Sequence, residues 1–122
     1  MAVQHVEELR VWQLAMDLVV SIYQLTAGFP QTEKYGLTSQ IRRAAVSVPA
    51  NIAEGQGRDS TKEFLHHLSI ARGSLMEART ELLIAGRLQY TSEERLQAVL
   101  ASLGEVSRML RGLQHSLKAR IE

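Results

Sequence analysis

The sequence predicts an all-α fold, an antiparallel up-down four-helix bundle, and three observations support this. Apolar residues make up 45% of the 122 residues but aromatic residues only 5%, and Pro occurs twice. This composition favours helices over sheets. Apolar residues also recur every three or four positions through four long segments with short connections, which is typical of packed amphipathic helices. The length suits a single domain over residues 1–122.

The first helix is predicted over residues 6–27. It carries two apolar stripes, so we expect it to bury more than one narrow face. The helix should end before Pro30, which cannot continue it. The two stripes are Trp12, Ala15, Val19, Ile22 and Thr26, and Val11, Leu14, Leu18 and Leu25.

The second helix is predicted to begin between Gln31 and Leu37 and to end near Glu54. Pro49 lies inside it, where a missing N–H and a crowded carbonyl at Ala45 cost about 3 kcal/mol. Because Ile52 continues the apolar face, we expect one helix kinked at Pro49 rather than two helices. Ser47 or a water molecule is expected to help satisfy the freed carbonyl. The apolar face is Leu37, Ile41, Ala44, Ala45, Val48 and Ile52.

The third and fourth helices are each preceded by a capping-box pattern, at Ser60 to Glu63 and at Thr91 to Glu94. In the third helix the apolar residues alternate spacings of four and three, which is a heptad pattern with small residues along one seam. These residues are Phe64, Leu68, Ala71, Leu75, Ala78, Leu82 and Ala85. The fourth helix has an apolar face of Leu96, Leu100, Leu103, Val106, Leu110, Leu113, Leu117 and Ile121.

Motifs for catalysis or cofactor binding are weak. A di-iron bundle needs two Glu-x-x-His motifs, but the chain has one, from Glu63 to His66, and Glu63 is assigned to a cap. The segment Gly55-Gln56-Gly57-Arg58 lacks the spacing of a phosphate loop, so a turn is the better interpretation. Without Cys there is no thiolate ligand or nucleophile. We therefore predict a non-enzymatic protein without a metal or cofactor.

Charge and the N-terminal sequence suggest the protein's setting. The apolar start of the chain is interrupted by charged residues, which argues against a signal peptide or membrane span and favours the cytoplasm. The net charge is only +1. Residues 106–121, however, carry four basic side chains and no acid, namely Arg108, Arg111, Lys118 and Arg120. With Arg58, these are the candidate nucleic-acid contacts.

Arg42 and Arg43 lie about 100° apart on a helix, so they face two surfaces. One interpretation is a solvated arginine and a partner for an acid such as Glu54 or Glu77. The other is contact with a second subunit or with phosphates. Asn51 and Glu54 follow Pro49, where they either satisfy polar groups nearby or shape a subunit interface or channel with Arg42 and Arg43.

Four stretches make up a resemblance that covers about four-fifths of the chain: "VWQLAMDLVVSIYQLTAGFP", "EKYGLTSQIRRAAVSVPANIAEGQGR", "EFLHHLSIARGSLMEARTELLIAGRLQY" and "RMLRGLQHSL". They resemble the bacterial four-helix-bundle family encoded in intervening sequences of 23S rRNA genes. The resemblance implies homopentameric rings with a central channel and no established enzymatic activity. A similar protein, the accessory variability determinant of diversity-generating retroelements, is a basic pentamer that binds nucleic acid and a reverse transcriptase.

Two functions follow as hypotheses. The first is a homo-oligomeric scaffold or adaptor that contacts structured RNA or DNA. The alternative is an oligomeric protein–protein interaction module with no nucleic-acid role. The near-neutral chain departs from the basic relative, which argues against the first hypothesis because phosphate neutralisation supplies non-specific affinity. Repetition of a local basic patch in an oligomer argues for it.

Overall fold

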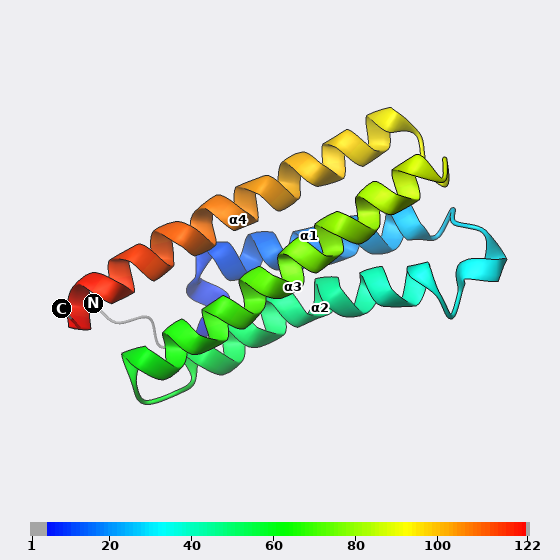
Figure 1. The fold of residues 1–122 in the computed structure, drawn as a ribbon. Helices are drawn as coiled ribbons and strands as arrows, with labels where there is room; N and C mark the ends of the chain where they lie inside the picture. The colour runs from blue at the N-terminus through cyan, green and yellow to red at the C-terminus, as the bar shows by residue number, and fades with distance from the viewer. Residues whose placement is uncertain (1–4, 122) are drawn as a thin grey trace.

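The computed structural model describes residues 5–121 and contains four long helices: α1 (Arg10–Thr26), α2 (Leu37–Gln56), α3 (Thr61–Arg87) and α4 (Glu93–Ile121). Two 3-10 turns, η1 (Val6–Glu8) and η2 (Gln31–Glu33), precede α1 and α2. Successive helices run in opposite directions along one axis (Figure 1). α1 packs on α2 and α4, and α3 packs on the same two helices. The predicted all-α bundle is confirmed, and residues 5–121 contain no strand.

The core forms from the predicted apolar faces. On α3 the heptad residues from Leu68 to Ala85 are completely buried, and on α2 the same holds for Ile41, Val48 and Ile52. Each fully buried aliphatic side chain stabilises the fold by roughly 1.5–3 kcal/mol relative to an exposed one. The heptad pattern therefore identified the seam along which α3 meets its neighbours.

α1 begins at Arg10, so the predicted start at Val6 is wrong. Leu9 has an extended backbone (φ −79°, ψ 120°), and this residue separates η1 from α1. η1 has its own stabilising contact, because the Glu8 carboxylate accepts a hydrogen bond from the His5 backbone N–H at 3.2 Å. The helical pattern of the sequence does not reveal this change of direction.

The helix starts near the two capping-box patterns differ in detail. Ser60 caps α3 as predicted, its hydroxyl accepting the Glu63 N–H at 3.1 Å. α4 begins one residue later than its pattern suggests, because Ser92 rather than Thr91 accepts the Arg95 N–H, at 3.2 Å.

At the C-terminal end of α4, Ile121 is 47% exposed, although the sequence places it on the apolar face of this helix. Figure 1 shows the reason, since α4 ends beyond the start of α1.

α2 continues unbroken through the buried Pro49, so the prediction of one helix rather than two is confirmed. The kink itself stays a prediction. The Ser47 hydroxyl does not turn to the Ala45 carbonyl but reaches α3, 2.8 Å from the Ser74 hydroxyl. Asn51 donates to the Ser47 carbonyl at 2.9 Å and contacts His67 Nδ1 at 3.2 Å. These contacts form a polar seam between α2 and α3.

Gly55 permits a close approach of these two helices. A Cβ at this position would lie 2.7 Å from the Cβ of His67 and 3.0 Å from Cδ1 of Phe64. Neither neighbour is the end of a flexible chain, so the helices would have to separate. Gly55 is therefore needed for the contact between α2 and α3, in addition to its position just before the turn that joins them.

We predict that Gly55→Ala lowers the unfolding free energy by about 1–3 kcal/mol, because overpacking forces backbone shifts. Urea denaturation followed by circular dichroism measures this change. Gly73→Ala on α3 is the matched control, since nothing lies within 4 Å of its added Cβ. That variant should gain about 0.5–1 kcal/mol from helix propensity. Equal effects of the two substitutions would contradict the close approach.

Candidate functional site

The predicted basic residues of α4 fall mostly on one exposed face. Arg108, Arg111, His115 and Lys118 follow one another at spacings of three, four and three, so they share one side of the helix. All four are exposed. Within residues 5–121 the structure has one ion pair, Arg58–Glu54, and none involving these side chains. We call Arg108, Arg111 and Lys118 the basic stripe, which extends over roughly 15 Å.

Arg120 and Arg58 belong to a different surface. Arg120 lies about 160° around the helix from Lys118. It lines a hollow of about 430 Å³ with Arg58, between the end of α4 and the α2–α3 turn. Asp59 lines the same hollow, and the Arg58 guanidinium is 2.7 Å from the Glu54 carboxylate. The five predicted nucleic-acid contacts thus divide into an uncompensated stripe and a hollow of mixed charge.

Arg42 is engaged inside the chain. Its Nε donates to the Thr26 hydroxyl at 2.8 Å and its Nη2 to the Tyr23 carbonyl at 3.2 Å. The guanidinium also lies 4.3 Å from the centre of the Tyr23 ring. α1 has no basic residue in its last turn. Arg42 therefore supplies, from α2, the positive charge that stabilises a helix C-terminus.

The other predicted interface residues differ in availability. Asn51 is part of the polar seam, and Glu54 pairs with Arg58 rather than with Arg42 or Arg43. Arg43 is exposed, and its guanidinium donates one long hydrogen bond within residues 5–121, to the Ser39 hydroxyl at 3.5 Å. It lines a hollow of about 280 Å³ with Glu77 but forms no ion pair within residues 5–121. The interface role of these four residues stays a prediction.

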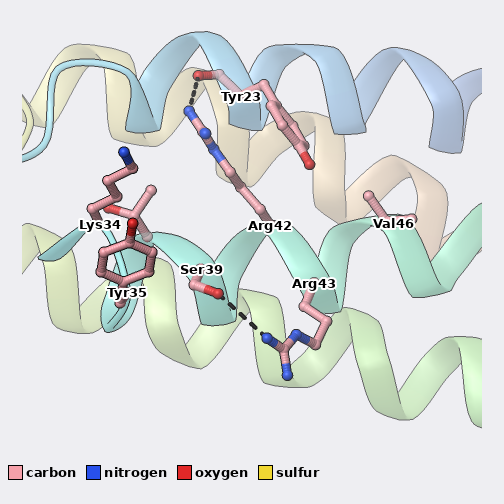
Figure 2. Close-up of a pocket in the computed structure, with 8 residues that line it drawn as sticks. Tyr23, Lys34, Tyr35, Ser39, Arg42, Arg43 and Val46 are labelled. Atoms are coloured by element: carbon pink, nitrogen blue, oxygen red, sulfur yellow. Dashed lines mark hydrogen bonds between the residues drawn. The ribbon is translucent and has the colours of Figure 1, made fainter.

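A groove of about 460 Å³ lies between α1 and the first half of α2 (Figure 2). It is lined by Tyr23, Lys34, Tyr35, Thr38, Ser39, Arg42, Arg43 and Val46. Figure 2 shows that Arg42 points toward α1 whereas Arg43 points to the other side of α2. Lys34 and Tyr35 were not singled out from the sequence. The sequence feature that could have identified them is a lysine and a tyrosine directly before Gly36, in a short connection between two helices.

A family model described as 23S rRNA-intervening sequence protein matches residues 7–112. The chain belongs to this family. The resemblance in the sequence is thereby confirmed. No curated protein matches the chain.

One solved structure has a similar fold. It is the 1.70 Å crystal structure of a protein with unknown function from the S23 ribosomal protein family of Bacteroides thetaiotaomicron VPI-5482. The two chains are 22% identical with a TM-score of 0.77, and the match covers 85% of this chain and 97% of that one. The likeness supports the bundle fold alone.

Residues 5–121 of this chain show neither a metal-ligand cluster nor a membrane-spanning helix. Residues 5–121 hold no group of three or more His, Cys, Asp or Glu side chains arranged to bind a metal ion. His67 contacts Asn51, and its ring meets that of His66 edge-on. None of the helices in the described range has the length and apolar character needed to cross a membrane.

Glu81 is the one buried acid among residues 5–121. It is 7% exposed, and its Oε1 has no hydrogen-bond partner there. Burial raises the pKa of Glu81, and the nearby charge of Glu77 raises it further. The folded state therefore favours the protonated form of Glu81. The contribution of this carboxyl group to the stability of the fold is fully present at low pH and is lost as the pH rises through its raised pKa.

We predict that Glu81→Gln is more stable than the wild type at pH 8, because it removes a buried charge. The difference should shrink toward about pH 4, near the ordinary pKa of a glutamate. Thermal unfolding across this pH range measures both effects. Glu77→Gln is the control and should give a smaller gain, since Glu77 is exposed. Parallel pH profiles for wild type and Glu81→Gln would contradict the prediction.

Proposed function

We propose that this protein is a non-enzymatic homo-oligomer, with the pentamer as the expected form, that binds structured RNA or DNA as a cytoplasmic scaffold or adaptor. The observation that carries the proposal is the basic stripe. Arg108, Arg111 and Lys118 are exposed on one helix face, and no acid within residues 5–121 pairs with them.

The arrangement of these cations matters more than the net charge of +1. Nucleic-acid affinity comes mainly from cations that displace counterions at phosphates, and this is a local effect. The stripe sits on a 29-residue helix, which holds the charges at fixed separations. Fixed charges suit the fixed phosphate array of a folded nucleic acid.

Oligomerisation would strengthen a modest stripe. Three cations per subunit give weak binding at physiological salt, but the same stripe repeated around a ring engages one nucleic acid at several points. Each later contact is then intramolecular and benefits from a high effective concentration. The proposal thus depends on the oligomer as well as on the stripe.

Exposed apolar side chains favour the alternative, a protein–protein interaction module. Met16, Val20 and Tyr23 follow one side of α1 at helical spacing, and Val46 of α2 is similarly exposed, each by 41–55%. An apolar surface of this kind fits a subunit contact or a separate protein partner. Native mass spectrometry of the purified protein separates the two functions, since it reports subunit number and retained nucleic acid together.

We predict that the triple variant R108Q/R111Q/K118Q weakens binding to a structured RNA hairpin. Each lost phosphate contact should lower the slope of log affinity against log salt by about one. Fluorescence anisotropy across a salt series measures both quantities. The triple variant K62Q/R79Q/R87Q, which removes the same charge from exposed positions of α3, is the control.

The control variant should keep most of the salt slope. If the two triple variants lose affinity equally, binding follows net charge and the stripe has no special role. If the wild type binds no RNA or DNA even at low salt, the nucleic-acid function is wrong, and retained protein partners would then favour the interaction module.

A further inference from the structure

The groove of Figure 2 has the composition of a ligand site that the proposed function does not use. It lies between α1 and the first half of α2, toward the end of the bundle that holds η2 (Figure 1). The basic stripe lies on the last half of α4, toward the other end. A ligand in the groove would therefore be separate from one on the stripe.

The charge of the groove is one-sided. Lys34, Arg42 and Arg43 line it, and no described Asp or Glu does. An adjoining hollow of about 190 Å³ shares Lys34 and Arg42 and is also free of described acids, whereas the hollow of about 280 Å³ that shares Arg43 is lined by Glu77 as well. Such a concentration of cations favours an anion.

The nearest acid in the sequence is engaged elsewhere. Glu33 Oε1 accepts the Leu37 N–H at 2.9 Å, and Oε2 accepts the Tyr90 hydroxyl at 2.9 Å. The bond from Leu37, followed by that from Tyr90, holds the pKa of Glu33 below its usual range. Its carboxylate is thus anionic but committed to the start of α2 and to Tyr90.

The three cations play different parts. Arg42 is fixed by its bonds to Thr26 and Tyr23 and forms a rigid wall. Arg43 has one long bond, 3.5 Å, to Ser39, and Lys34 forms no ion pair within residues 5–121. Lys34 and Arg43 therefore have donors available for a phosphate at little cost in broken contacts.

Two tyrosines complete the groove. Tyr35 is 89% exposed, the highest exposure among the large apolar and aromatic residues on the surface of residues 5–121, and the Lys34 ammonium lies 5.5 Å from its ring centre. Tyr23 is 41% exposed and has the Arg42 guanidinium against its ring. An exposed aromatic face beside cations suits a planar ring attached to a phosphate, since bases stack on such faces.

We propose that this groove binds a nucleotide unit, with its phosphate held by Lys34 and its base stacked on Tyr35, while Arg43, on the other side of α2, contacts a neighbouring phosphate when the unit is part of a strand. The unit has two possible sources with the same chemistry, a free mononucleotide or an unpaired nucleotide of an RNA strand. The inference goes beyond the proposed function because both the site and the ligand differ from the stripe and the folded nucleic acid.

The test uses the full chain and three probes: UMP, a labelled ten-nucleotide uridine strand and a blunt RNA hairpin. Tyr35→Ala should weaken binding of UMP or of the strand at least about fivefold, the lower end of a base–aromatic stacking contribution. Tyr35→Phe keeps the ring and should bind as the wild type does. Arg43→Gln should weaken strand binding and lower its salt slope by about one, whereas the control Arg79→Gln should change neither.

Binding of UMP that competes with the strand assigns a free-nucleotide site, and binding of the strand alone assigns an unpaired RNA segment. The inference is overturned if Tyr35→Ala and Arg43→Gln leave both ligands unaffected. It is also overturned if Tyr35→Ala changes only the subunit number in native mass spectra. In either case, hairpin binding that still depends on Arg108, Arg111 and Lys118 would leave the proposed function intact.

Discussion

The close contact between α2 and α3 is the constraint on which the rest of the structure depends. Gly55 allows the backbones to meet, and Ala71, Ala78 and Ala85 keep one seam of α3 small. The orientation of the other two helices is then set by polar contacts at partly buried positions. Arg42 of α2 ties the end of α1, and the buried Gln114 of α4 accepts a hydrogen bond from Arg72 of α3 at 3.2 Å. Apolar burial supplies most of the stability of the bundle, and these two contacts orient α1 and α4.

The arginines of this chain serve two purposes according to where their partners lie. Arg42 of α2 is engaged at the C-terminus of α1, and Arg58 in the α2–α3 turn pairs with Glu54. On α4, Arg108 and Arg111 have no ion-pair partner in the described range. A near-neutral chain therefore carries a local excess of positive charge, because residues 106–121 contain no acid and the acids lie elsewhere in the sequence. Net charge is a poor guide to partners when the charges are segregated in this way.

Much of the fold could be predicted from the sequence because the heptads of α3 and the apolar face of α2 are local patterns. The start of α1 could not, since one extended residue, Leu9, breaks an otherwise helical pattern. The role of Arg42 was missed because its partners lie on another helix, up to 19 residues away. The basic stripe was predicted as part of a larger set, and only the geometry separates Arg120 from it. The groove combines side chains of α1, a connection and α2, which no single window of sequence brings together.

The polar seam has a consequence for the alignment of α2 along α3. A heptad seam is nearly degenerate, since sliding one helix by seven residues places leucine on leucine and alanine on alanine again. The neighbouring positions of α3 are not degenerate: His67, Ser74 and Glu81 also follow one another every seven residues but differ in chemistry. In the observed register Ser74 meets Ser47 and His67 meets Asn51. A slip of one heptad would move a glutamate or a histidine onto Ser47 and leave Asn51 mismatched, so these few polar groups specify a single register for the hairpin.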